Sequence, residues 1–127
     1  MLKAEFSQLN LVEALAALSG TDLDALDFGV IGFDADGTVR LYNAFESRAA
    51  GLAPERVIGR HLFTSVAPCM NNFMVAQRFE DAAVNGVDLD ATIDYVLTLR
   101  MKPVKVRLRL LARAGAPLRH VLVDRRA

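Results

Sequence analysis

The sequence predicts an α+β domain with a five-stranded antiparallel sheet, a helical crossover on one face and an N-terminal helical cap. Three observations support this fold. Two apolar, β-favouring segments flank the hairpin signal Asp36-Gly37. The C-terminal part of the chain contains three more strand-like segments joined by turn signals. Between these two groups lie helix caps, glycine stops and an irregular stretch, which together predict the crossover.

The first 27 residues predict the cap. Asn10 and Glu13 have the spacing of a capping box, and the apolar residues that follow recur at helical intervals. Ser19-Gly20 predicts the end of this helix, because glycine allows a left-handed turn. A further short helical piece is expected over residues 21–26.

Helices and strands follow in an order typical of an α+β domain. The predicted crossover comprises a helix over 44–50 capped by Asn43, a short helix that starts at Pro54, an irregular loop over 60–70, and a helix from 73 to about 84. The first hairpin has strands over 28–34 and 38–42, and the last three strands span 91–100, 104–112 and 118–125.

A chain of 127 residues is long enough for one domain with a buried core. We expect residues 1–27 to form the cap and residues 28–127 the sheet-containing core. No apolar run is long enough to cross a bilayer and the start lacks a secretory pattern, so a cytoplasmic protein without a membrane partner is expected. A net charge of zero argues against nucleic acid as a partner.

The zero net charge hides an uneven distribution. Residues 1–99 contain 6 basic and 14 acidic side chains, whereas residues 100–127 contain 9 basic and 1 acidic. The simpler interpretation is a solvated basic face on the C-terminal strands. A second hypothesis is that the acidic cap docks against Lys105, Arg107 and Arg109, in which case docking weakens with salt.

Cys69 is the one cysteine of the chain, so it cannot form an internal disulfide. Alone, such a residue is more often a small buried apolar group than a reactive centre. Tyr42 and Glu46 lie a short connection upstream. A phenol, and a carboxylic acid kept protonated by burial, can both donate hydrogen bonds to a buried anion. A thiol and two such donors are suited to anchor a ligand and hold its far end.

His61 and His120 are the histidines, and both are expected on the surface or in loops. No spacing pairs either of them with Cys69 as a thiol enzyme would require, and one cysteine with two scattered histidines does not indicate a zinc site. We therefore expect no enzyme activity and no metal.

The most specific motif of the chain combines Tyr42, Glu46 and Val66-Ala67-Pro68-Cys69. Further residues of the same pattern are Leu23-Asp24, Leu26, Phe28-Gly29, Asp34, Asp36-Gly37, Asn43-Ala44, Gly51, Pro54, Val57-Ile58-Gly59 and Phe63. On these residues the chain resembles the photoactive yellow protein family, which are blue-light receptors built on a PAS domain. The resemblance runs from about Asp22 to the C-terminus.

This resemblance implies a PAS fold and a p-coumaric acid (4-hydroxycinnamic acid) pigment linked to Cys69 as a thioester. It also implies that Tyr42 and Glu46 donate hydrogen bonds to the pigment's phenolate oxygen. The other residues implied to line the pocket are Ala50, Leu52, Leu62, Val66, Ala67, Pro68, Tyr95, Leu97 and Met101.

Some positions depart from the family pattern. Leu52 occupies the position of the family's pocket-gating arginine, and Ala50 that of a threonine which supports the tyrosine. Leu99 stands where a tyrosine is frequent, and Leu62 and Leu97 where phenylalanines are frequent. Because Leu52 carries no charge, we expect hydrogen bonds alone to hold the pigment's anion.

The resemblance implies a light-driven switch. Light isomerises the pigment from trans to cis, Glu46 passes its proton to the phenolate, and the buried carboxylate left without a partner drives partial unfolding of the cap. An unknown downstream signalling protein is the expected partner, and the chain is expected to be a monomer or a weak dimer. The alternative is a PAS ligand-sensing or protein-interaction module without the pigment.

Overall fold

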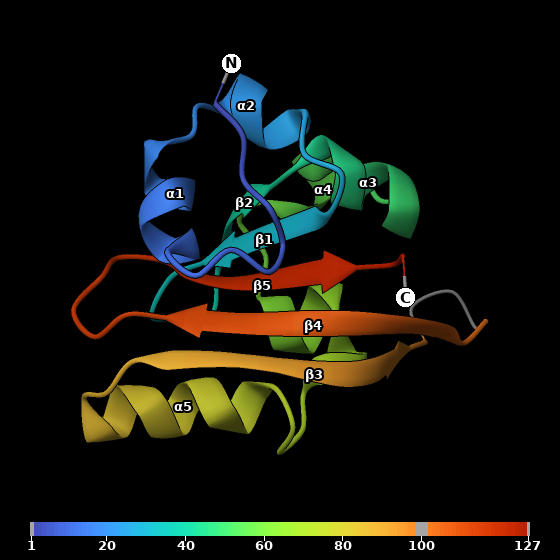
Figure 1. The fold of residues 1–127 in the computed structure, drawn as a ribbon. Helices are drawn as coiled ribbons and strands as arrows, with labels where there is room; N and C mark the ends of the chain where they lie inside the picture. The colour runs from blue at the N-terminus through green and yellow to red at the C-terminus, as the bar shows by residue number, and fades with distance from the viewer. Residues whose placement is uncertain (1, 99–101, 127) are drawn as a thin grey trace.

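The computed structural model describes residues 2–98 and 102–126, and it confirms the predicted fold class (Figure 1). A five-stranded sheet in the order β2-β1-β5-β4-β3 lies at the centre, and all its neighbouring strands are antiparallel. The strands are β1 (Gly29–Phe33), β2 (Val39–Tyr42), β3 (Leu89–Leu97), β4 (Val104–Ala112) and β5 (Arg119–Asp124). The first hairpin and the last three strands therefore join where β1 pairs with β5.

The α-helices precede the sheet or form the crossover. They are α1 (Leu11–Ala17), α2 (Gly20–Asp24), α3 (Ala44–Ala50), α4 (Pro54–Val57) and α5 (Ala76–Asn85). The predicted limits of α3 are confirmed: the Asn43 side chain caps its first turn, and Gly51 ends it in a left-handed conformation with φ of 73°. Among the described residues, no helix combines the length and apolar character needed to cross a membrane.

Two of the predicted helix starts are wrong. The Asn10 side chain makes no capping hydrogen bond, and the capping box lies instead between Ser19 and Asp22, so Ser19 starts α2 rather than ending α1. The helix expected from residue 73 begins at Ala76, because the Asn72 side chain accepts hydrogen bonds from the backbone amides of Met74 and Val75 and holds a turn there.

The segment expected to be an irregular loop contains two short helical turns. A π-helical turn, η1 (Leu62–Val66), starts where His61 Nδ1 accepts hydrogen bonds from the next backbone amides. A 3₁₀ turn, η2 (Pro68–Met70), has Pro68 at its first position, where the missing N–H of proline costs nothing. Proline excludes a long helix here, but it permits these short turns.

The sheet has an apolar core on each face. On β5, Val121 and Val123 belong to the core beneath the crossover helices, whereas Leu122 belongs to the core beneath the cap. Successive side chains of a strand point to opposite faces, so the two sets alternate. Figure 1 shows the N-terminal segment on one side of β1 and β5 and the helices α3 and α4 on the other.

The prediction of a solvated basic face on the C-terminal strands is wrong for Arg109, which is only 5% exposed. Its guanidinium donates hydrogen bonds to the backbone oxygens of Phe6 (2.8 Å) and Gln8 (2.6 Å) in the cap. The same group donates to both oxygens of Asp90, at 2.9 and 2.8 Å. The Arg107 guanidinium lies 5.5 Å from the centre of the Phe6 ring. The cap therefore covers part of the basic face.

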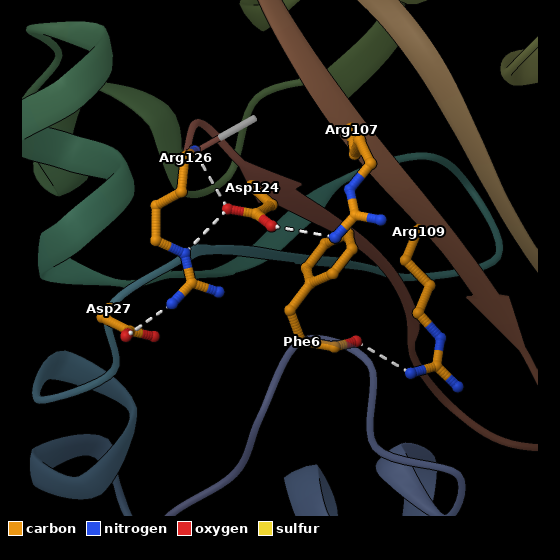
Figure 2. A network of polar contacts seen from close by, with 6 residues as sticks. All are labelled: Phe6, Asp27, Arg107, Arg109, Asp124 and Arg126. Atoms are coloured by element: carbon orange, nitrogen blue, oxygen red, sulfur yellow. Dashed lines mark hydrogen bonds and ion pairs between the residues drawn. The ribbon is translucent and has the colours of Figure 1, made fainter.

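A carboxylate at the end of β5 links this face to the cap (Figure 2). Asp124 accepts hydrogen bonds from Arg107 (3.4 Å) and Arg126 (3.0 Å), and Arg126 also pairs with Asp27 of the cap at 3.0 Å. Burial acts against ionisation of Asp124, but hydrogen bonds from Arg126 and Arg107 outweigh it and lower its pKa. The expected contact between acidic cap and basic strands is present, although Lys105 is exposed and takes no part in these interactions.

Arg109→Gln is expected to loosen the cap. The change leaves two backbone oxygens of the cap without their donor, so the free energy of unfolding should fall by about 1–3 kcal/mol, as measured by urea denaturation. The matched control is Arg113→Gln, which removes an exposed pair with Glu13 and should cost no more than about 1 kcal/mol. Equal losses in the two variants would contradict the role given to Arg109.

Candidate functional site

The site is built around Glu46, a carboxyl group that is only 1% exposed on the first turn of α3. Asn43 fixes the start of this helix. Its side chain accepts a hydrogen bond from the Glu46 amide (3.1 Å) and donates to the backbone oxygens of Leu23 (2.9 Å) and Phe28 (3.1 Å). These bonds hold α3 against α2 and the start of β1, and so place the Glu46 side chain over the sheet.

Gly29 on β1 leaves the space that the Glu46 carboxyl group occupies. A Cβ atom at position 29 would lie 2.0 Å from Glu46 Oε1, which no side chain could tolerate without moving the carboxyl group. Gly29 pairs with Val123 of β5. The carboxyl group therefore lies beside the junction of β1 and β5, on the crossover side.

Arg125, the residue directly after β5, holds the Glu46 carboxyl group. Its Nη1 donates to Oε1 at 2.7 Å and its Nη2 donates to Oε2 at 3.0 Å, and the arginine side chain is 17% exposed. Because Val123 faces the crossover side, the residue two positions later faces the same side. Sequence reasoning missed Arg125. The basic excess of residues 100–127 was the one signal for it, and that excess does not single out a residue.

Arg125 corrects the expectation that a Glu46 carboxylate would be left without a partner. Leu52 supplies no charge, but Arg125 brings a guanidinium to the Glu46 carboxyl group from 79 residues further along the chain. Burial raises the pKa of Glu46, while hydrogen bonding and the charge of Arg125 act in the other direction without cancelling the shift. Glu46 thus binds its proton more tightly than an exposed glutamate does.

Tyr42 at the end of β2 is buried in the crossover core, with 6% of its surface exposed. No described residue forms a hydrogen bond with its hydroxyl group. That oxygen is not fully enclosed, because every fully enclosed side-chain nitrogen or oxygen among the described residues has a partner. Burial raises the pKa of Tyr42, the charge of Glu46 adds to this shift and Arg125 opposes it. Tyr42 is therefore a neutral donor available to a ligand at physiological pH.

Cys69 lies on η2, and its side chain is half-buried against the crossover core. Two side chains fix its backbone. The Tyr95 hydroxyl group donates to the Cys69 carbonyl oxygen at 2.5 Å, and the Asn72 amide group donates both to that oxygen (3.2 Å) and to Tyr95 Oη (2.6 Å). Tyr95, a predicted pocket residue, is thus brought next to the thiol-bearing residue.

A cleft of about 720 Å³ opens beside Cys69. Its lining comprises Ala50, Gly51, Leu52, Ser65, Val66, Pro68, Cys69 and Thr98. Of the other predicted pocket residues, Leu62, Ala67 and Leu97 are buried in the crossover core, to which Tyr42 also belongs. Met101 and Leu99 lie outside the described residues. The cleft and the core beneath it therefore bring together the thiol and most of the predicted pocket.

The two histidines lie at the start of η1 and in β5. His61 is half-buried and starts η1, as described above. His120 lies in β5 and not in a loop; its side chain is half-buried, and burial lowers its pKa to about 4. His120 is therefore neutral at physiological pH. Among the described residues, no cluster of histidine, cysteine and acidic side chains is suited to hold a metal ion.

The element order and the five-stranded antiparallel sheet are those of a PAS domain. In agreement, the family model described as PAS fold matches residues 23–124. Proteins named photoactive yellow protein are similar in sequence: that of Rhodothalassium salexigens is 36% identical over 106 residues, covering 84% of each chain, and that of Halochromatium salexigens is 38% identical over 105 residues, covering 83% of each.

A solved structure is similar over nearly the same extent. It is the crystal structure of the photoactive yellow protein domain from the sensor histidine kinase Ppr of Rhodospirillum centenum. It matches with a TM-score of 0.81 at 38% identity, covering 88% of this chain and 97% of that one. The chain belongs to the photoactive yellow protein family, as the residues around Tyr42, Glu46 and Cys69 predicted.

Gly29→Ala is expected to displace the Glu46 carboxyl group and to lower the free energy of unfolding by about 1–3 kcal/mol, because the added methyl group overlaps a buried oxygen. The matched control is Gly20→Ala in α2, where a Cβ atom meets nothing within 4 Å. The control should stabilise the protein by up to about 1 kcal/mol. Denaturant unfolding measures both, and a Gly29→Ala variant as stable as the control would contradict the close approach of Glu46.

Proposed function

We propose that this protein is a blue-light photoreceptor that carries p-coumaric acid as a thioester on Cys69. Membership of the photoactive yellow protein family supports the class of function. The observation that supports the chemistry is a half-buried thiol on an open cleft, beside a core in which the Tyr42 hydroxyl group has no partner among the described residues. The bound group would supply absorption of light, isomerisation about its double bond and an ionisable phenol.

Cys69 would form the covalent link. Its sulfur attacks the carbonyl carbon of an activated p-coumaric acid, such as the anhydride, and forms the new C–S bond. The bond from that carbon to the leaving group breaks, and the leaving group takes the thiol proton. The hydrogen bonds from Tyr95 and Asn72 to the Cys69 carbonyl oxygen hold the backbone in place during this step.

Tyr42 and Glu46 would hold the far end of the ligand. Burying an anion is costly unless donors replace the lost water, and charge-assisted hydrogen bonds are the strongest of those available. The Tyr42 hydroxyl group is a neutral donor without a partner among the described residues. Glu46, whose pKa is raised by burial, is a second donor while it keeps its proton. In the light, Glu46 would give up this proton and become a buried carboxylate.

The N-terminal cap would be the element that responds. Even with Arg125 as its partner, a charge formed away from water carries a desolvation cost of several kcal/mol, which is comparable with the roughly 5–15 kcal/mol that stabilises a whole small domain. The cap is short, and polar contacts with Arg109 in the middle of β4 and with Arg126 just after β5 help to hold it. Its partial release would admit water to the charged site and expose the sheet to an unknown downstream signalling protein.

The test is reconstitution with the anhydride of p-coumaric acid. The wild-type protein should gain the mass of one p-coumaroyl group and become yellow, whereas Cys69→Ser should do neither. Mass spectrometry and visible absorbance measure the two outcomes. A wild-type protein that gains no mass, or a Cys69→Ser variant that becomes equally yellow, would overturn the attachment. Added mass without visible colour would overturn the role given to Tyr42 and Glu46.

A further inference from the structure

We propose that Arg125 is the counter-ion of Glu46 and determines how readily Glu46 gives up its proton and takes it back. The proposal rests on the proposed function, because it adds a residue to the proton-donating part of that site. Leu52 carries no charge, and the proposal is that Arg125, directly after β5, supplies the positive charge of the site.

The geometry of the pair supports this role. The two guanidinium nitrogens face the two carboxyl oxygens at 2.7 and 3.0 Å, so both oxygens accept a hydrogen bond, as they do in the ionised form. Glu46 is 1% exposed and the Arg125 side chain 17%, so water screens the pair little. A guanidinium stays charged under all physiological conditions. The Glu46 carboxylate is therefore not left unpaired when it forms.

No other cation lies against this carboxyl group among the described residues. From β1 the neighbour is Gly29, and from β2 it is Tyr42, which is neutral. The nearby acid of α2 is Asp24, which is exposed and accepts a hydrogen bond from the Ala44 amide at 2.8 Å. Arg125 is thus the charged partner that favours the ionised form of Glu46 over the protonated form.

Neighbouring residues provide a matched control. Arg126 follows Arg125 directly, but it pairs with Asp124 and Asp27 on the cap side of the sheet. Replacing Arg126 removes the same charge from nearly the same place in the chain without touching Glu46.

The first experiment uses the protein without pigment. Glutamate labelled with ¹³C at its side-chain carboxyl group is titrated by NMR, and Glu46→Gln identifies the Glu46 signal. A neighbouring opposite charge lowers a carboxyl pKa by about 1–3 units, so Arg125→Gln should raise the pKa of Glu46 by at least about one unit. Arg126→Gln should leave it unchanged. A Glu46 pKa that is equal in wild type and Arg125→Gln would overturn the proposal.

A double variant covers the case in which Arg125→Gln does not fold. Removing one partner leaves a buried charge unpaired, whereas removing both does not. The double variant Glu46→Gln/Arg125→Gln should then fold. If Glu46→Gln folds alone but the double variant does not, Arg125 has another structural role and the proposal fails.

The second experiment uses the reconstituted protein. Because Arg125 stabilises the carboxylate formed in the light, Arg125→Gln should speed the return to the dark state, by up to about tenfold for each unit of pKa. An unchanged rate together with an unchanged titration would overturn the proposal while the photoreceptor function stands. If the wild-type protein takes up no pigment, the proposed function fails, and the titration still decides whether Arg125 is the counter-ion.

Discussion

The buried carboxyl group of Glu46 is the constraint on which the arrangement of the site depends. It needs a residue without a side chain at position 29, a helix start fixed by Asn43, and a guanidinium from Arg125. These three requirements come from β1, from the residue that starts α3 and from the residue after β5. Because each requirement falls on a different segment, the carboxyl group is enclosed only where the three segments meet in the folded sheet. The contacts that place the Glu46 carboxyl group are therefore also contacts that hold the fold together.

The end of β5 connects the two faces of the sheet. Asp124 and Arg126 contact the cap side, whereas Arg125 lies between them in the chain and contacts Glu46 on the crossover side. Successive side chains of an extended strand point to opposite faces of the sheet, and this alternation alone produces the division. A change in the charge of Glu46 and a change in cap docking therefore act on adjacent residues of one short segment.

Local patterns in the sequence predicted the elements that local interactions determine. The limits of α3 followed from Asn43 and Gly51, and the predicted strand over 104–112 matches the limits of β4. Tertiary contacts decided the rest. Asn10 has a suitable neighbour for a capping box, but Ser19 forms it. Arg109 has the pattern of a solvated residue, and the cap buries it. Arg125 could not be found, because its contact with Glu46 spans most of the chain and depends on which strand lies beside β1.

The most direct test of the central claim, that Glu46 holds a proton in the dark and loses it in the light, is an infrared difference spectrum of the reconstituted protein. The carbonyl stretch of a protonated carboxyl group absorbs apart from that of a carboxylate, so the two forms can be separated. We predict that illumination removes a protonated-carboxyl band in the wild-type protein and that this loss is absent in Glu46→Gln. A wild-type spectrum without the loss, or a Glu46→Gln spectrum that retains it, would contradict the assigned role of Glu46.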